Sequence, residues 1–238
     1  MRRRFFVEAF DGGRAVLTGE GAHHLGRVLR AEPGQLYELS DGMSVWLGRI
    51  SSAGKDEVAF ELVEEIAAGK SSLEITLLLA VVKFDAFEWA IEKATELGVS
   101  RIVPLAAARS EKGLLGGAEK RAERWKRIVF EASQQSRRVR LPAILPVTAP
   151  RAAFADASHR LKLMLSERAD AQSLRSALND EPRGESVALA IGPEGGWTEE
   201  EFALARRAEF REVSLGSLIL RTETAVTAAL ASVNFAWG

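Results

Sequence analysis

The first 70 residues carry short apolar runs that are separated by turn signals. Residues 35–39 and 45–50 alternate between apolar and polar positions, a period typical of strands with one buried face. Four glycine-containing turn signals follow at regular spacing, at residues 11–13, 32–34, 40–42 and 52–54. This pattern predicts a small β-barrel or β-sandwich over residues 1–70, interrupted by a short helix over residues 23–30.

The pattern changes after Leu73, where segments with a helical period alternate with short apolar runs. The predicted strands are residues 74–82, 101–105, 161–165, 187–191 and 213–215. The predicted helices are residues 84–97, 118–136, 198–208 and 222–237. Alternating strands and helices indicate a parallel sheet that is covered on both faces. Residues 73–238 are therefore expected to form a second, α/β domain, joined to the first by a linker at residues 67–72.

The last predicted helix, residues 222–237, is apolar on almost every side. A helix without a polar face is buried all round. Burial within one domain and burial against a second subunit of a homodimer both explain this pattern, and the sequence leaves the two explanations open.

The composition excludes several kinds of site. The chain has 238 residues, of which 47% are hydrophobic, with no cysteine and only three histidines, His23, His24 and His159. Disulfides and thiolate metal sites are excluded, and no ligand spacing suggests another metal site. No apolar run reaches the roughly 18 residues of a membrane span, and the basic N-terminus lacks the apolar region of a signal peptide. We therefore expect a cytoplasmic protein with neither a metal ion nor a membrane partner.

Charge is distributed unevenly along a chain whose net charge is −1. Residues 119–140 contain eight lysines and arginines against three glutamates. Such a segment is typical of a surface that binds a polyanion such as RNA. A solvated helix face with ion pairs along the helix is the alternative.

Two glycine-containing turns are the strongest functional signal. Ile191-Gly192-Pro193-Glu194-Gly195-Gly196 and Ser214-Leu215-Gly216 each follow a predicted strand and precede a predicted helix. This arrangement places both at the carboxyl ends of neighbouring strands, where open α/β sheets bind ligands. The glycines allow a ligand to approach the backbone closely. Tight turns with no ligand remain the alternative.

The charge near the first turn argues against a phosphate ligand. Glu194 lies within the turn, and Glu199, Glu200 and Glu201 open the following helix, where they also form a capping box with Thr198. Four carboxylates around one helix start repel a phosphate. Neither the P-loop pattern nor a GxGxxG sequence after a strand is present. A neutral or cationic ligand fits better, for example a nucleoside that carries a positive sulfonium.

Several segments also match one family. They are residues 24–30, Lys83 with 93–99, Arg124-Trp125, Glu131-Ala132, 135–138, Pro142, 191–196 and 220–225. Over nearly its full length the chain resembles the RsmE-type 16S ribosomal RNA (uracil-N3)-methyltransferases of the SPOUT superfamily. Two positions depart from that resemblance: Leu218 stands where the family commonly has arginine, and Arg137 stands where a small residue is usual.

The resemblance implies a fold and a ligand. It implies a PUA-like RNA-binding β-barrel over residues 1–70 and a SPOUT methyltransferase domain with a deep trefoil knot over residues 73–238, which forms a homodimer. It implies S-adenosylmethionine as the cofactor. The implied cofactor-binding residues are Leu165, Ser166, Ile191, Gly192, Gly195, Gly196, Leu215, Gly216, Leu220, Thr224 and Ala225.

The implied reaction is methylation of N3 of a uridine in 16S ribosomal RNA, with naked rRNA or the assembled small subunit as the partner. The weakly acidic N3–H requires a base or an anion-stabilising donor. The candidates are Arg138, Arg221 and, more weakly, Glu223, because Glu223 also suits a helix start. The expected RNA-binding residues are His24, Arg27, Arg30, Arg124, Arg127, Arg137 and Arg138. The alternatives are an RNA-binding assembly factor without methyl transfer, an enzyme that acts on a nucleotide phosphate, and methylation of a ribose 2′-OH or another base.

Overall fold

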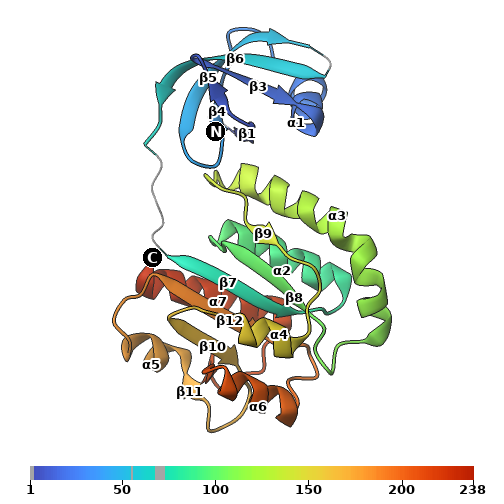
Figure 1. Ribbon diagram of the computed structural model, residues 1–238, viewed down its shortest axis with the longest axis vertical. Helices are drawn as coiled ribbons and strands as arrows, with labels where there is room; N and C mark the ends of the chain where they lie inside the picture. The colour runs from blue at the N-terminus through green and yellow to red at the C-terminus, as the bar shows by residue number, and fades with distance from the viewer. Residues whose placement is uncertain (1–2, 55, 68–72) are drawn as a thin grey trace. The chain divides into compact units, whose positions relative to one another are not determined.

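A computed structural model describes residues 3–54, 56–67 and 73–238 (Figure 1). The chain forms two compact units. The first contains Met1–Lys70 together with Ser133–Leu141, and the second contains Ser71–Ala132 and Pro142–Gly238. Most of the expected linker at 67–72 lies outside the described residues.

The first unit is a curled six-stranded sheet with the strand order β1-β4-β5-β6-β3-β2 (Figure 1). Its strands are β1 (Arg4–Phe6), β2 (Phe10–Asp11), β3 (Arg14–Thr18), β4 (Leu36–Ser40), β5 (Val45–Ala53) and β6 (Glu57–Glu65). Neighbours are antiparallel except β1 and β4, which are parallel. Phe5, Leu39 and Phe60 are buried in the core of this unit. The β-rich module predicted from the alternating pattern is therefore confirmed.

The helix of the first unit begins earlier than predicted. It consists of α1 (Gly19–His23) followed by one turn of π-helix, η1 (His24–Val28). Ala22 and Leu25 are fully buried in the core of the curled sheet. These two apolar residues, one turn apart, define the inner face of the helix. The prediction of 23–30 therefore missed its first turn.

The second unit contains a seven-stranded sheet with the order β11-β13-β10-β12-β7-β8-β9. Its strands are β7 (Glu74–Ala80), β8 (Arg101–Leu105), β9 (Ala143–Ile144), β10 (Leu161–Leu165), β11 (Gln172–Ser173), β12 (Ser186–Ile191) and β13 (Arg211–Ser214). All neighbours are parallel, as predicted. Leu77, Leu163 and Leu189 are fully buried in its core. The carboxyl ends of the strands consequently share one edge of the sheet.

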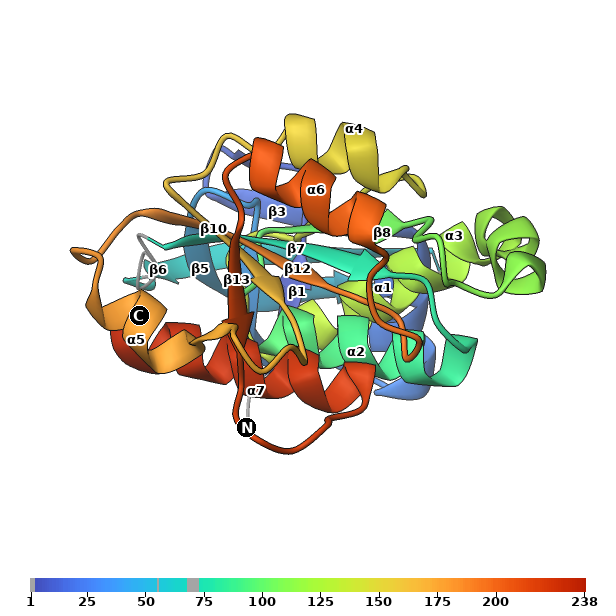
Figure 2. The same ribbon diagram turned by 90° about the horizontal axis from the view of Figure 1, so that it is seen from below.

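Helices cover both faces of this sheet (Figure 2). They are α2 (Phe84–Glu96), α3 (Lys112–Gln135), α4 (Pro150–Ala155), α5 (Leu174–Asn179), α6 (Glu199–Arg207) and α7 (Thr222–Trp237). Figure 2 shows α4 and α6 on one face and α2, α5 and α7 on the other. Phe154 and Phe202 pack on the first face, and Phe87 and Val226 on the second. This confirms the predicted three-layer α/β arrangement.

Two short helices, α4 and α5, were not predicted. Each has six residues, which is too short for a helical period to appear in the sequence. Helix α3 begins six residues before its predicted start, because Leu114 and Leu115 pack against the core although glycines surround them. Within the described residues no helix is both long and apolar enough to cross a membrane.

The last helix, α7, spans the residues predicted for it but is buried on one side only. Val226, Ala229 and Val233 are fully buried, whereas Phe235 is 95% exposed. Burial all round is therefore wrong for a single chain. The deep trefoil knot that the resemblance implies stays a prediction.

Candidate functional site

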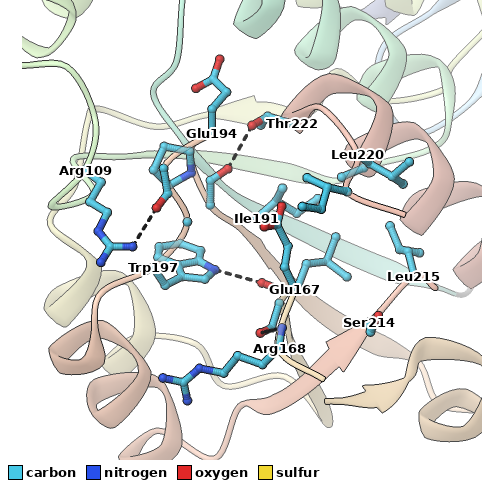
Figure 3. Close-up of a pocket in the computed structure, with 18 of the residues that line it drawn as sticks. Arg109, Glu167, Arg168, Ile191, Glu194, Trp197, Ser214, Leu215, Leu220 and Thr222 are labelled. Atoms are coloured by element: carbon cyan, nitrogen blue, oxygen red, sulfur yellow. Dashed lines mark hydrogen bonds between the residues drawn. The ribbon is translucent and has the colours of Figure 1, made fainter. Parts of the chain in front are cut away.

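A cavity of about 410 Å³ lies at the carboxyl ends of β10, β12 and β13 (Figure 3). Its volume is in the range that holds a small ligand or cofactor. The loops after β8, β10, β12 and β13 form its walls, together with the starts of α6 and α7. The lining residues are Arg109, Leu165–Arg168, Ile191–Trp197, Glu199, Phe202, Ser214–Leu220, Thr222 and Ala225.

The structure brings nearly all the residues predicted to bind a cofactor into this one cavity. Those that line it are Leu165, Ser166, Ile191, Gly192, Gly195, Gly196, Leu215, Gly216, Leu220 and Ala225. Thr224 is the exception, because it is an exposed residue of the first turn of α7. Thr222 and Ala225, three residues apart on one helix face, take the positions toward the cavity.

The glycine loop after β12 is fixed by a buried tryptophan. Trp197 donates its Nε1–H to the carbonyl of Leu165 at 3.0 Å, which links this loop to the end of β10. A Cβ on Gly192 would lie 3.0 Å from the Trp197 ring, so only glycine fits here without movement of the ring. Gly196 has φ +67°, a left-handed conformation that favours glycine, and its N–H bonds the Pro193 carbonyl at 2.8 Å.

Two further contacts hold the outer side of the same loop. Thr222, in the first turn of α7, donates its Oγ1 hydrogen to the carbonyl of Gly192 at 3.2 Å. Arg109, which follows β8, donates from Nη1 to the carbonyl of Gly195 at 2.7 Å (Figure 3). Sequence reasoning missed Arg109, because no local pattern indicates that the loop after β8 reaches the loop after β12.

The ring of carboxylates predicted around the start of α6 is only partly present. Glu201 is buried and completes the predicted capping box with Thr198, and it also accepts the Ala108 N–H at 2.8 Å. Glu200 lies 3.8 Å from Arg151 and does not line the cavity. The expectation that four glutamates face the ligand is therefore wrong. Glu201 caps the start of α6, and Glu200 lies on the surface of this helix near Arg151.

Glu199 does line the cavity, but an arginine neutralises it. Arg168, in the loop after β10, forms an ion pair with Glu199, and its guanidinium stacks 3.9 Å from the centre of the Phe202 ring. The hydrogen bond between these two side chains lowers the pKa of Glu199 and raises the pKa of Arg168. Next to Arg168, Ser166 donates to Glu212 at 2.5 Å, which fixes the end of the strand.

Glu167 is the carboxylate that points into the cavity. It extends from the loop after β10 toward Ile191, whereas Glu194 extends outward from the glycine loop (Figure 3). In the described part of the chain neither carboxylate has a hydrogen-bond or ion-pair partner. The residues predicted to bind the cofactor include Ser166 but not Glu167, which follows it. The cavity thus combines apolar walls, backbone groups and one inward negative charge.

Arg221 and Glu223 lie at the start of α7, beside lining residues but outside the lining itself. Arg221 occupies the N-cap position and is exposed, with no partner for its side chain among the described residues. Glu223 lies in the first turn, where a negative charge is favoured by the helix dipole. The position of Glu223 agrees with the helix-start interpretation, whereas Arg221 makes no side-chain cap hydrogen bond, and the chemical roles of both residues stay predictions.

The residues expected to bind RNA fall into two groups. His24, Arg27, Arg30, Arg137 and Arg138 belong to the first unit, while Arg124 and Arg127 belong to the second. In the first group, His24 Nε2 lies 2.8 Å from Arg3 Nη1, and Arg27 and Arg30 are exposed. The basic segment predicted as one surface is therefore divided between two units.

In the second group, Arg124 lies in an ion-pair cluster on the surface of α3. Arg124 Nε donates to Glu88 Oε2 at 2.7 Å, and Arg121 Nη1 donates to Glu88 Oε1 at 3.0 Å. The hydrogen bond between Arg124 and Glu88 raises the pKa of Arg124. The cluster keeps a surplus of one positive charge, and Arg127 on the same helix is exposed. The solvated-helix alternative thus describes part of the basic segment.

No group of three or more histidine, aspartate or glutamate side chains in the described ranges is arranged to hold a metal ion.

Comparisons with known proteins agree on one family. Residues 69–234 match the model of an RNA methyltransferase domain, and residues 17–63 match that of an RNA methyltransferase PUA domain. The chain is 36% identical to the ribosomal RNA small subunit methyltransferase E of Synechocystis sp., covering 92% of this chain and 72% of that protein. It is 31% identical to the protein of that name from Bacillus subtilis, covering 98% and 96%.

Solved structures give the same result. The ribosomal RNA small subunit methyltransferase E of Neisseria gonorrhoeae, bound to S-adenosyl methionine, superposes with a TM-score of 0.88 at 31% identity. The superposition covers 100% of this chain and 99% of that one. The two-part architecture described above is therefore shared over the whole length of both chains.

Proposed function

We propose that this chain, which belongs to the RNA methyltransferase family, transfers a methyl group from S-adenosylmethionine to N3 of a uridine in 16S ribosomal RNA. The observation that carries the proposal is the cavity at the strand ends, which holds one inward carboxylate, Glu167, among apolar walls and glycine backbone. Adenosine is neutral, and the sulfonium is cationic. Such a ligand matches this cavity better than a nucleotide phosphate does.

The reaction requires an unpaired uridine, because N3 lies on the Watson–Crick edge of the base. The methyl carbon must lie in line between the sulfonium sulfur and N3, and such alignment can supply roughly 7–11 kcal/mol of the lowering of the barrier. As N3 loses its proton, negative charge develops on the uracil ring. We assign Arg138 and Arg221 to the stabilisation of this charge, and Glu223 is a weaker candidate for the base.

The exposed basic residues would hold the RNA backbone. His24, Arg27, Arg30 and Arg137 would do so on the first unit, and Arg124 and Arg127 on the second. Such contacts position the RNA without reading its sequence. We also propose that the protein acts in the cytoplasm, with naked 16S rRNA or the small ribosomal subunit as its substrate. We further propose that the chain around the cavity is threaded as the deep trefoil knot of the family it resembles.

The test is nucleoside analysis of 16S rRNA by mass spectrometry in a strain that lacks the gene. We expect N3-methyluridine to disappear and to return when the purified protein and S-adenosylmethionine are added to small subunits from that strain. Loss of a 2′-O-methylated or other nucleoside instead would redirect the reaction to a different atom. Undiminished modification, with no calorimetric binding of S-adenosylmethionine, would favour an assembly factor without methyl transfer.

Glu167→Gln is expected to weaken binding of S-adenosylmethionine about tenfold, because it removes a charge worth roughly 1.4 kcal/mol to a nearby cation in a solvated cavity. Binding of S-adenosylhomocysteine, which has a neutral thioether in place of the sulfonium, should stay almost unchanged. Calorimetry with both ligands gives the two dissociation constants. Glu200→Gln is the matched control, since Glu200 lies on α6 outside the lining. An equal loss for both ligands would contradict a role in charge recognition.

We also propose a homodimer through the second unit, with α7 in the interface. Ala231, Phe235 and Ala236 are exposed on this helix, with Phe235 95% exposed, and a contiguous exposed apolar patch marks an interaction site. Phe235→Glu is expected to weaken dimerisation at least about 100-fold, because it places an unpaired charge in an apolar contact. Light scattering after size exclusion measures the mass. Met43→Glu, an exposed residue of the first unit, is the control, and a dimeric Phe235→Glu protein would exclude this interface.

A further inference from the structure

The segment that follows α3 is built into the first unit by hydrogen bonds to its backbone. Arg4 Nη1 donates to the carbonyl of Arg137 at 2.5 Å, and Ser40 Oγ donates to the carbonyl of Val139 at 2.7 Å. In return, Arg140 Nε donates to the carbonyl of Gly42 at 2.5 Å. Donors on β1 and β4 thus hold the carbonyls of Arg137 and Val139, which lie two residues apart in this segment. Backbone contacts fix its path whatever side chains it carries.

The donor Arg4 is itself held by a buried carboxylate. Arg4 Nε and Nη2 donate to Glu38 Oε2 at 3.2 and 2.9 Å, and the two side chains are only 9% and 11% exposed. A buried ion pair is costly unless all of its polar atoms are satisfied. Here the remaining guanidinium nitrogen, Nη1, is the one that bonds the Arg137 carbonyl. The ion pair therefore orients Arg4 Nη1 toward the carbonyl of Arg137.

Arg137 has a backbone conformation that needs such support. Its φ is +55°, in the left-handed region that residues other than glycine adopt at a cost in energy. The next residue, Arg138, donates its N–H to the carbonyl of Ser133 at 3.0 Å, which closes the end of the helix. The Arg137 guanidinium lies 3.6 Å from the second oxygen of Glu38. Glu38 therefore contacts Arg137 directly and also holds the arginine that bonds its carbonyl.

These contacts determine where Arg138 lies. Its backbone follows directly from the clamped Arg137, and its Nε donates to the carbonyl of Arg140 at 3.1 Å, while partial burial lowers its pKa. We propose that Arg4, Glu38 and Ser40 are positioning residues, which make Arg138 part of the RNA-binding surface of the first unit. This proposal rests on the proposed function, in which Arg138 acts on the uridine. Arg138 would then be carried by the same unit as His24, Arg27, Arg30 and Arg137.

Arg4→Lys and Ser40→Ala test the proposal. A lysine ammonium keeps the charge but has no planar fork that bonds Glu38 and the Arg137 carbonyl together. Ser40→Ala removes only one hydroxyl. We expect each variant to lower kcat/KM for small subunits about tenfold, through a higher KM for RNA and a lower kcat, with an unchanged dissociation constant for S-adenosylmethionine. A purely structural role would instead reduce the fraction of active protein and leave KM unchanged.

Arg49→Lys, an exposed arginine on β5 of the same unit, is the matched control and should behave as wild type. If Arg4→Lys proves unfolded by circular dichroism, Ser40→Ala alone decides the result. Wild-type KM and kcat in folded variants would overturn the proposal, as would a parallel loss of kcat and cofactor binding. If the wild-type protein binds RNA but forms no N3-methyluridine, the proposed function fails separately. The RNA dissociation constants of the variants, measured without cofactor, then still test the positioning.

Discussion

Arg138→Ala is expected to lower kcat for rRNA methylation by about 10²–10³, the loss typical when one donor that stabilises transition-state charge is removed. Arg138 directly follows the clamped turn at Arg137, and its guanidinium stays charged at neutral pH although burial lowers its pKa. Affinity for S-adenosylmethionine should equal that of the wild type, because no residue of 133–141 lines the cavity. Single-turnover kinetics with small subunits and calorimetry with the cofactor give the two quantities.

Arg138→Lys separates charge from geometry in the same experiment. A lysine restores the positive charge but not the planar fork, so we expect it to recover part of the lost rate. Arg49→Ala, on β5, serves as a control for the loss of one exposed arginine. Unchanged turnover in Arg138→Ala would remove this residue from the mechanism and would leave Arg221 as the remaining cation candidate.

Gly192→Val is expected to weaken S-adenosylmethionine binding about 100-fold or more. Even a Cβ at this position would lie 3.0 Å from the Trp197 ring, and the ring is buried, so it has little room to move. Displacement of the ring breaks its hydrogen bond to the Leu165 carbonyl and narrows the cavity. Overpacking of this kind costs about 1–3 kcal/mol and the lost hydrogen bond about 1 kcal/mol, where 1.4 kcal/mol is a factor of ten in affinity.

Calorimetry and thermal unfolding check this expectation together. Gly113→Val is the matched control, because a Cβ at Gly113 in α3 meets no atom within 4 Å. The control should bind cofactor as the wild type does. Wild-type affinity in a folded Gly192→Val protein would show that the ligand does not depend on the shape of the glycine loop, and would move the cofactor site elsewhere.

Local sequence patterns determined most of the secondary structure and the location of the cavity. The strands β8 and β10 and the helix α7 match their predicted bounds, because each carries a clear period or ends at a strong turn or cap signal. The two glycine turns were recognised for the same reason. Glycine permits the backbone conformations of tight turns, and parallel strands bring their carboxyl ends to one edge. Ile191 and Leu215 therefore line the same cavity, although they lie 24 positions apart in the sequence.

Local sequence patterns could not predict contacts between residues that are distant along the chain. Glu199, Glu200 and Glu201 look equivalent in the sequence, yet one pairs with Arg168, one lies near Arg151 and one caps the helix. Which partner each carboxylate meets depends on loops that are distant along the chain. The inward direction of Glu167 could not be predicted either, because the geometry of the loop, and not the type of residue, sets the direction of a side chain.

The sequence by itself determined the two β and α/β modules, the glycine cavity and the family that the chain resembles, because these depend on periodicity and on short motifs. Only the tertiary structure decided that Ser133–Leu141 belongs to the first unit. Hydrogen bonds from Arg4 and Ser40, 133 and 99 residues away from their acceptors, hold this segment. A hydrogen bond depends on distance in space, and the fold alone sets that distance.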